Sequence, residues 1–476
     1  MSLRTSILSS HEMFVKLEKE NTVLKEENAV LKAENNDLKA ENAELKARLA
    51  QNSTNSSRPP SSDGLQKKPA MPRKKGGKRG GQKGHKGKTL EQSKSPDKIV
   101  NLSPVECGCG QDLSSEEKTD IECRQLFDLP EPKLEVIEYR KQGCTCPKCG
   151  AHNVGIFPDH IRSRVQYGNG VRAFVSLLNV YYKVPYKKIS QLFADLYGYG
   201  INESTIVSAV KRCYEQLQSS EQVIREKLLA SKLAHFDETG IRCEGKLHWL
   251  HVCCTAMFTY LFVHAKRGGK ALADSMSIFS DFQGWVVHDC WTSYFSFSKK
   301  KYALCNAHII RELVALDEQG NPWACWFKDF LLGLLEMTKQ GNNVLEQTQQ
   351  KQVVTLFDNL WQHADRIEPP PKKIPGKKGK PKATKGRNLL IRLRKHKHAI
   401  LAFAFQQHVP FTNNQAERDL RPAKSKIKVA GCFRTFQGAQ SHARIQAFIS
   451  TTRKHQLNVF QQLKNAFFGH TFLTKE

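Results

Sequence analysis

The fold is decided by two short apolar stretches, Leu233-Ala-His-Phe-Asp-Glu-Thr-Gly240 and Gly284-Trp-Val-Val-His-Asp-Cys290. Apolar and β-branched residues dominate both, and short runs of this kind are typical of strands buried in a sheet. Each stretch ends in or near an aspartate, Asp237 in the first and Asp289 in the second. The sequence therefore predicts two strands that each present a carboxylate at or near their ends.

The residues around these stretches extend the pattern to a whole sheet. Periodicity predicts strands at 233–243, 246–255 and 258–264, a helix at 268–282, strands at 284–290 and 302–305, and a helix at 307–316. Three strands, a helix and a strand, in this order, are typical of a ribonuclease-H-like fold, in which the first and fourth strands are neighbours. Asp237 and Asp289 could therefore lie side by side in the folded chain.

A third carboxylate, Glu417, lies in Thr412-Asn-Asn-Gln-Ala-Glu-Arg-Asp-Leu-Arg-Pro422. This stretch is typical of a helix that has Thr412, Asn413 or Asn414 as its N-cap and that Pro422 ends or kinks. Before it, half-apolar patterns predict helices at 323–338 and 344–366, followed by a run rich in proline and lysine. We interpret this intervening part as a helical insertion between the second and third carboxylates.

Two strand carboxylates and one helix carboxylate can hold two divalent ions about 3.5–4 Å apart, which is the geometry of phosphoryl transfer on nucleic acids. Each acid also has an ordinary interpretation. Both aspartates could be simple strand-end residues, and Glu417 could pair with Arg421 at i,i+4. Two neighbouring acids are set aside, because Glu238 should face the other side of its strand and Asp419 the other side of its helix.

The charge of the chain indicates a polyanionic partner. The 476 residues carry a net charge of +28, and the pI is about 9.6. Much of the excess lies in two blocks without acids, 67–88 with ten Lys or Arg residues and 372–397 with twelve. Neutralisation of phosphates by such residues drives binding to DNA, although solvated linkers are the alternative. We expect double-stranded DNA as the partner.

Composition also limits where the chain acts. No stretch of about 18 apolar residues is present, and the N-terminus lacks the pattern of a signal peptide, so we expect a cytoplasmic protein with no membrane partner. Fourteen cysteines occur, several in C-x-C and C-x-x-C arrangements. Such clusters are typical of metal binding in a reducing compartment rather than of a disulfide framework.

The N-terminal segment 12–50 has a seven-residue repeat. Leucines occupy every d position, and asparagines occupy the a positions Asn21, Asn28, Asn35 and Asn42; the d positions are Leu17, Leu24, Leu31, Leu38 and Leu45. Glutamates at g and lysines at e would face each other in a parallel pair, so we expect a dimeric coiled coil. A single solvated helix is the alternative. The following segment, 51–98, is rich in Ser, Pro, Gly and Lys and is predicted to be a disordered basic linker.

Two cysteine pairs in segment 99–165 predict a zinc-binding domain. Cys107 and Cys109 form the first pair, Cys146 and Cys149 the second, and a glycine follows each pair. Four thiolates at two tight turns are what a tetrahedral structural Zn²⁺ site needs. Cys144 competes as a ligand of the second pair. The alternating residues 121–139 between the pairs are predicted to form strands of a zinc ribbon.

Segment 166–230 is predicted to be helical, with helices at 171–182, 185–197 and 203–217 and with Asn202 or Ser204 as the cap of the third. The second and third helices are joined by a short turn that contains glycine. This arrangement is similar to a helix-turn-helix that binds DNA. A small three-helix packing domain would give the same pattern and remains the alternative.

At this point the chain resembles bacterial transposases of the insertion sequence 66 family, which are DDE transposases. Besides the leucine heptads and cysteine pairs, five motifs carry the resemblance over nearly the whole length: Gly80-Gly-Gln-Lys-Gly-His-Lys86, His235-Phe-Asp-Glu-Thr239, Cys305-Asn-Ala-His308-Ile-Ile-Arg311, Asn413-Asn-Gln-Ala-Glu-Arg-Asp-Leu-Arg-Pro422 and Ser441-His-Ala-Arg-Ile445 with Thr452. The resemblance implies that Asp237, Asp289 and Glu417 form a triad that binds Mg²⁺ (or Mn²⁺). Cys305 and His308 are interpreted as positioning or structural residues rather than metal ligands.

The complete prediction is a multidomain α+β protein. It comprises a coiled coil (12–50), a basic linker (51–98), a zinc-binding domain (99–165), a helix-turn-helix-like domain (166–230), the first part of a ribonuclease-H-like core (231–318), a helical insertion (319–405) and the end of the core (406–476). The expected function is DNA transposition on element ends and target DNA, in a nucleoid-associated dimer or larger assembly and with companion proteins of the same element as possible partners. A DNA-binding regulator without catalysis and a nuclease that cuts without joining are the alternatives.

Overall fold

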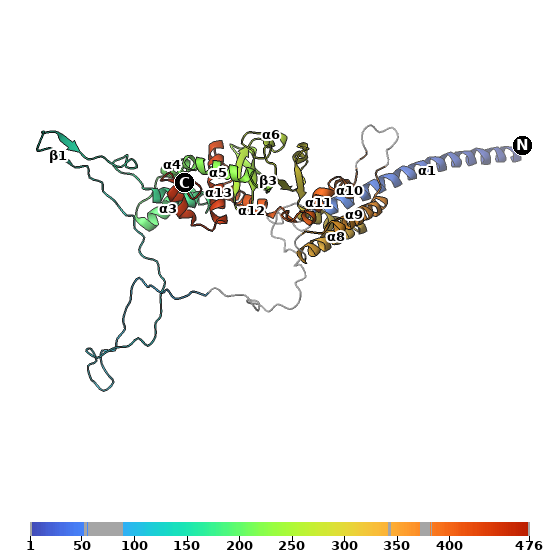
Figure 1. Cartoon of the computed structure of the whole chain (residues 1–476). Helices are drawn as coiled ribbons and strands as arrows, with labels where there is room; N and C mark the ends of the chain where they lie inside the picture. The colour runs from blue at the N-terminus through green and yellow to red at the C-terminus, as the bar shows by residue number, and fades with distance from the viewer. Residues whose placement is uncertain are drawn as a thin grey trace. The chain divides into compact units, whose positions relative to one another are not determined.

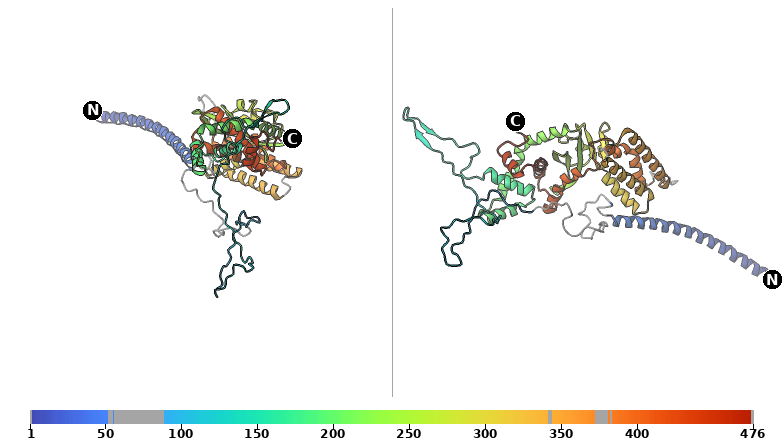
Figure 2. Two further views of the ribbon diagram at one scale, coloured as in Figure 1. Left: turned by 90° about the vertical axis from the view of Figure 1, so that its left-hand side faces the viewer. Right: turned by 60° about the horizontal axis from the view of Figure 1, so that its bottom comes forward.

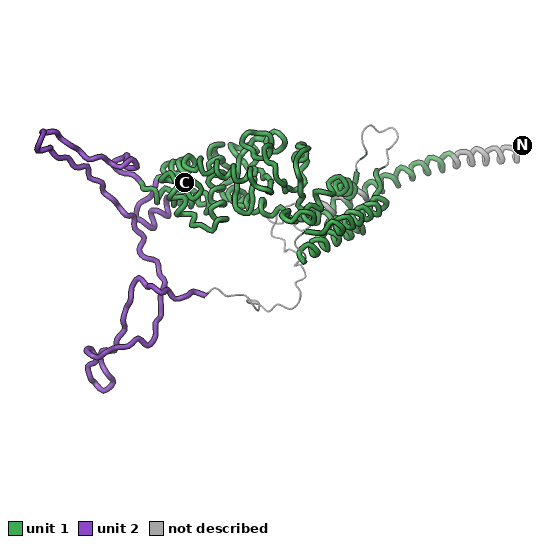
Figure 3. Tube along the Cα trace, viewed as in Figure 1, with its two compact units in different colours: residues 1–66, 167–189, 202–476 green, residues 67–166, 190–201 purple. Residues whose placement is uncertain are grey.

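The computed structural model describes residues 2–51, 55, 89–340, 344–371, 381 and 383–474. The chain divides into two compact units (Figure 3): unit 1 comprises residues 1–66, 167–189 and 202–476, and unit 2 comprises residues 67–166 and 190–201. The basic block 67–88 therefore lies outside the described residues. Within the described ranges, no helix combines the length and the apolar composition needed to cross a bilayer.

A five-stranded mixed sheet forms the centre of unit 1, with the strand order β5-β4-β3-β6-β7. The strands are β3 (Leu233–Cys243), β4 (Lys246–Cys254), β5 (Thr259–His264), β6 (Trp285–His288) and β7 (Lys301–Leu304). β3 pairs antiparallel with β4 and parallel with β6. Glu244 and Gly245 join β3 to β4 and both have positive φ, as a tight two-residue hairpin requires. The predicted adjacency of the first and fourth strands is confirmed.

The two faces of the sheet are covered by different helices. Alternate residues of β3 point to opposite faces. Ala234 and Phe236 pack with α5 (Gln218–Leu229) and with the segment that precedes β6. Ile241 and Cys243 pack instead with α12 (Asn414–Ala430) and α13 (Phe436–Lys454). Odd-numbered residues of β3 therefore face α12.

The predicted helix 268–282 is wrong for most of its length. Only α6 (Gly269–Leu272) is helical there. Beyond it, the Asp274 carboxylate accepts a hydrogen bond from the backbone N–H of Met276 at 2.8 Å, and the Ser277 hydroxyl accepts one from Phe279 at 3.1 Å. Short polar side chains that bond to nearby amides compete with helical hydrogen bonds. The apolar residues of this segment are buried against the sheet without forming a helix.

The entry into β6 depends on Gly284. A Cβ at this position would lie 2.6 Å from the backbone oxygen of Lys232 and 2.6 Å from the ring of Phe282. Because the first contact is with backbone, we expect Gly284→Ala to lower the free energy of unfolding by about 1–3 kcal/mol. Chemical denaturation measures the change. Gly333→Ala in α8 (Pro322–Gln340), where a Cβ meets nothing within 4 Å, is the matched control and should be neutral or stabilising; equal losses would contradict the prediction.

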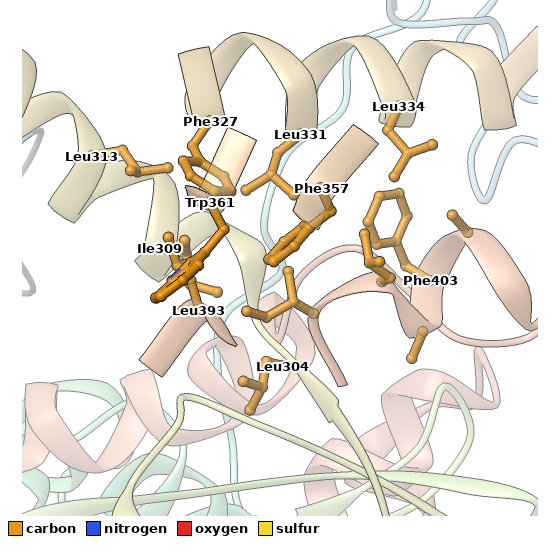
Figure 4. Close-up of a cluster of buried hydrophobic side chains, with 14 of the residues drawn as sticks. Leu304, Ile309, Leu313, Phe327, Leu331, Leu334, Phe357, Trp361, Leu393 and Phe403 are labelled. Atoms are coloured by element: carbon orange, nitrogen blue, oxygen red, sulfur yellow. The ribbon is translucent and has the colours of Figure 1, made fainter. Parts of the chain in front are cut away.

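The helical insertion packs on the edge of the sheet next to β7. It contains α8, α9 (Gln347–Ile367), α10 (Lys385–Lys395) and α11 (Lys397–Phe405), which gather together in the views of Figures 1 and 2. Its core is a layer of large side chains that includes Phe327, Phe357 and Trp361 (Figure 4). The same buried cluster includes Leu304 of β7, so the insertion and the sheet share one core.

The sequence pattern predicts a linker for the second basic block, but part of this block is folded. Residues 372–380 and 382 lie outside the described residues, but α10 begins at Lys385 with Thr384 as its N-cap, whose hydroxyl accepts from the Arg387 amide at 2.9 Å. The apolar residues at helical spacing are buried: Leu389, Leu390 and Leu393. An amphipathic pattern within the basic run explains why this part folds.

The three helices predicted in segment 166–230 are confirmed as α2 (Asn169–Val180), α3 (Tyr186–Tyr197) and α4 (Glu203–Gln216). Asn202 caps α4, because its side chain accepts from the Ser204 amide at 2.9 Å. α2 and α4 share a buried cluster with α13 and with α14 (Val459–Ala466). The C-terminal helices are thus part of the support for α2 and α4. DNA reading by these helices stays a prediction.

Unit 2 differs from the predicted zinc ribbon. Its strands are β1 (Gly143–Thr145) and β2 (His152–Val154), which pair antiparallel. The prediction of strands at 121–139 is wrong, because this segment, which the structure describes throughout, contains none. Ile121 and Val136 are 98% and 90% exposed, so no other described residue covers these two side chains. Pro130 and Pro132 also remove two backbone donors that a ladder would need.

The N-terminal segment forms one continuous helix, α1 (Ser2–Leu49). Four of its d-position leucines have described side chains, and all four are exposed: Leu24, Leu31, Leu38 and Leu45. A second helix could bury this stripe. Pairing of two chains through α1 stays a prediction.

Candidate active site

Asp237 and Asp289 come to the same level of the sheet. In the parallel pairing of β3 with β6, His235 lies opposite Val287. Asp237 and Asp289 each follow two residues later, so the two carboxylates arise side by side on adjacent strands. Asp289 directly follows the end of β6, but β3 continues beyond Asp237 to Cys243, so the prediction that Asp237 lies at or near a strand end is wrong. Asp237 is odd-numbered on β3 and therefore faces α12, like Ile241. The structure thus brings together the two aspartates that the sequence singled out.

The electrostatics of Asp237 reflect this proximity. Burial raises the pKa of Asp237 well above its usual range, and the negative charges of Asp289 and Glu238 raise it further. The Glu238 amide, which donates to Asp237 Oδ1 at 2.8 Å, and the distant charge of Lys424 act in the opposite direction but do not compensate. A carboxylate in this position lacks a matching cation, and a divalent ion would supply one.

The chain turns sharply after β6, which sets the direction of Asp289. Cys290 has a φ of 73°, a left-handed conformation that is uncommon for a residue with a side chain. The turn allows the backbone N–H of Trp291 to donate to Asp289 Oδ1 at 3.2 Å. The carboxylate is therefore oriented by its own loop.

Glu417 lies in the first turn of α12, on the sheet face toward which Asp237 points. Ala416, Leu420 and Ala423 of this helix are buried against β3 and β4. The prediction that Pro422 ends the helix is wrong, because α12 runs through Pro422 to Ala430. The proline removes one backbone donor, while apolar residues on both sides of it remain packed on the sheet, and this packing keeps the helix continuous.

His308 connects Glu417 to the rest of the site. It lies in the first turn of α7 (Asn306–Asp317), and its Nε2 is 3.7 Å from Glu417 Oε1. Burial lowers the pKa of His308 despite the opposing influence of Asp289 and Glu417, which are both close enough to act on it. His308 and Glu417 form an ion pair only when His308 is protonated, and among the described residues Glu417 has no ion pair with Arg421.

The donor set is suited to a hard divalent cation, which prefers carboxylate oxygens. Glu417 Oε1 is buried and has no hydrogen-bond partner, and Asp237, whose residue is half-buried, lies beside the like charges of Asp289 and Glu238. Nevertheless, in the described part of the chain no three His, Cys, Asp or Glu side chains are arranged closely enough to hold a metal ion. The acids share one region of unit 1 without converging on one point.

Comparison with known proteins identifies the family of the chain. A family model described as "Transposase IS66 family" matches residues 164–441, more than half of the chain and the whole of the region that carries the three acids. The chain belongs to this transposase family. A second model, of a family of unknown function (DUF6444), matches residues 12–91. No curated protein matches the chain.

A buried network lies on the other face of β3, beneath the candidate site. Glu238 faces away from α12 as expected, and its carboxylate accepts from Arg267 Nε at 2.7 Å and from the Tyr294 hydroxyl at 2.6 Å. The Arg267 guanidinium lies 3.6 Å from the centre of the Trp291 ring. The network therefore joins β3 to the loop that orients Asp289. Sequence reasoning missed Arg267 and Tyr294, because no local pattern marks them.

Asp419 has a structural role, consistent with its exclusion from the site. Its carboxylate pairs with Lys454 at 2.6 Å and accepts from the hydroxyls of Thr259 and Ser450, each at 3.1 Å. These contacts anchor α12 to β5 and α13. Removing one partner of such a buried ion pair strongly destabilises the fold, because the other charge is left buried and uncompensated.

The four predicted zinc ligands lie in two separate turns of unit 2. Gly110 and Gly150 follow the turns with φ of 89° and 72°, as the sequence had suggested for glycines beside cysteine ligands. The Cys109 amide lowers the pKa of Cys107, and the Cys149 amide lowers the pKa of Cys146, so each turn favours a thiolate. The two pairs do not combine into a metal-binding group among the described residues. Zn²⁺ binding stays a prediction.

Proposed function

We propose that this chain is the DNA transposase of an insertion sequence, which binds the ends of its element and catalyses metal-dependent strand cleavage and strand transfer. One observation carries the proposal. The parallel pairing of β3 with β6 brings Asp237 level with Asp289, on the face of the sheet where α12 presents Glu417. The strand order β5-β4-β3-β6-β7 supports a ribonuclease-H-like core, and membership of the transposase family supports the reaction class.

Asp237, Asp289 and Glu417 are the residues that would hold Mg²⁺ (or Mn²⁺). Bound divalent ions supply an activated water or 3′-OH nucleophile and stabilise the oxygen that leaves phosphorus. The Glu238 and Trp291 amides orient the two aspartates. No side-chain nucleophile is required, since the 3′-OH freed by cleavage of the element end attacks the target strand directly.

The charge of the chain and the exposed leucines of α1 support DNA as the substrate and a second chain as a partner. The charge of +28 favours attraction to phosphates. The exposed leucine stripe of α1, flanked by Glu and Lys at the g and e positions, supports a parallel dimer. A zinc-stabilised domain built from Cys107, Cys109, Cys146 and Cys149, a helix-turn-helix at α3 and α4 and companion proteins of the same element are further parts of this proposal.

A joining assay tests the proposal. The full chain is incubated with duplexes that carry candidate element ends and with a target plasmid in Mg²⁺. We expect free 3′-OH ends and covalent donor–target products. Binding without any free 3′-OH would favour a regulator that lacks catalysis. Cleavage without joined product would favour a nuclease.

A further inference from the structure

Asn413 occupies a buried junction between three elements of the core. It is 1% exposed. Its Oδ1 is 2.8 Å from His235 Nδ1, its Nδ2 donates to the backbone oxygen of Phe236 at 2.9 Å, and its own backbone N–H donates to Cys305 Sγ at 3.1 Å. Both ends of the side-chain amide are therefore satisfied.

These contacts reach the segments that carry the proposed ligands. His235 and Phe236 directly precede Asp237 on β3. Cys305 is the N-cap of α7, three residues before His308. The backbone oxygen of Asn413 accepts from the Glu417 amide at 3.4 Å, which begins the hydrogen bonding of α12. One residue is thus bonded to the elements of Asp237, His308 and Glu417.

The hydrogen bonds also fix the orientation of the amide. Because a backbone carbonyl can only accept, Nδ2 must face Phe236 and Oδ1 must face His235. His235 then carries a proton on Nδ1. In a flipped amide, Oδ1 would face the backbone oxygen of Phe236, so two acceptors would meet. Nδ2 would then face the N–H of His235 and remain an unsatisfied donor, which is costly in a site closed to water. The junction therefore has one stable arrangement.

Helix capping does not explain this residue. Asn413 is the N-cap of α12 by position, yet its side chain accepts no hydrogen bond from the amides of that helix. Its bonds go instead to β3 and Cys305. The adjacent Asn414 is exposed and is part of the same sequence motif, but it lies outside the junction.

We propose that Asn413 is a positioning residue that fixes the first turn of α12 against β3, and so sets the position of Glu417 relative to Asp237 in the proposed metal site. Cys305 is its second anchor, which gives the Cys305–His308 motif a role in alignment. The inference rests on the proposed function, since it concerns the affinity of the same site for a divalent ion.

The expected consequence is a weaker metal site in a folded protein. Residues that orient metal ligands change metal affinity about 10–100-fold when they are replaced. Misplacement of a reacting group by about 1 Å costs on the order of 100-fold in rate. We therefore expect Asn413→Ala to raise the half-saturating Mn²⁺ concentration at least about 10-fold and to slow end cleavage about 100-fold, with partial rescue at high Mn²⁺.

The test measures metal binding without catalysis. Mn²⁺ is titrated onto the full chain without DNA, and binding is followed by calorimetry and by the rise in melting temperature. Asn414→Ala is the matched control and should titrate like the unaltered chain. Normal Mn²⁺ affinity in folded Asn413→Ala, or an equal loss in Asn414→Ala, would overturn the inference.

Two further comparisons keep the result decisive. If Asn413→Ala does not fold, Cys305→Ser and Cys305→Ala replace it. Because the serine hydroxyl can still accept the hydrogen bond from the Asn413 N–H, Cys305→Ser should lose less Mn²⁺ affinity than Cys305→Ala. The reverse order would refute the positioning role of Asn413. Glu417→Gln separates the two hypotheses. If it binds Mn²⁺ and cleaves normally, the proposed site itself is wrong; if it fails while Asn413→Ala behaves normally, only the positioning role is wrong.

Discussion

Asp237→Asn, Asp289→Asn and Glu417→Gln should each reduce end cleavage and strand transfer at least about 10³-fold in Mg²⁺. An amide has nearly the same shape as a carboxylate but carries no charge, so it cannot balance a divalent ion. The rates are measured on labelled duplexes by denaturing gel electrophoresis. DNA binding, followed by fluorescence anisotropy, should stay nearly unchanged, because the proposed ligands are not phosphate contacts.

Asp281→Asn is the matched control for these variants. Asp281 is an exposed acid close to β6, outside the proposed ligand set, and its replacement should leave cleavage near the level of the unaltered chain. Strand transfer retained by any of the three site variants would refute the assignment of that residue. Comparable losses in Asp281→Asn would indicate a general charge effect.

The same Asp237→Asn variant should be more stable than the unaltered chain when metal is absent. Burial and the charges of Asp289 and Glu238 raise the pKa of Asp237, so its ionised form is unfavourable in the folded state. The protonated carboxyl of Asp237 stabilises the folded state. This contribution to the free energy of unfolding is fully present below the unfolded pKa of about 3.9 and is lost as pH rises through the folded pKa. Melting curves with a chelator present should therefore show that Asp237→Asn loses this part of the pH dependence.

Affinity for duplex DNA should fall about 10³–10⁵-fold between 50 and 200 mM salt if six to ten phosphates are contacted. The physical reason is the release of counterions from DNA when lysines and arginines neutralise phosphates. The block 67–88 alone carries ten basic residues and no acid. Replacing all ten with glutamine should lower the slope of log affinity against log salt by about 0.9 for each phosphate that the altered chain no longer neutralises.

Lys339 and Lys351 provide the control for this prediction. Both are exposed lysines of the helical insertion, on α8 and α9, and their replacement by glutamine should change the slope much less than replacement of the block. Binding that is insensitive to salt would contradict an interface dominated by phosphates. An unchanged slope after replacement of the block would place the phosphate-binding residues elsewhere on the chain.

Local pattern was sufficient for the strands of the central sheet and for most helices, but not for the strands of unit 2. The stretch from Leu233 predicts β3 over its full length, although polar residues such as Asp237 and Arg242 interrupt its apolar residues, because short runs rich in β-forming residues are typical of strands. The adjacency of Asp237 and Asp289 also followed, because strand order restricts which strands can be neighbours. Segment 268–282 was predicted wrongly where Asp274 and Ser277 bond to nearby amides, a competition that periodicity does not register.

The sequence by itself determined which acids belong to the candidate site, because each one is marked by the short strand or helix pattern around it. Only the tertiary structure decided how the parts are joined: α12 continues through Pro422, His308 faces Glu417, and Asn413 binds β3 and Cys305 at once. These contacts join residues more than one hundred positions apart in the chain. Their energy comes from burial and from hydrogen bonds between distant elements, and neither leaves a periodic trace in the local sequence.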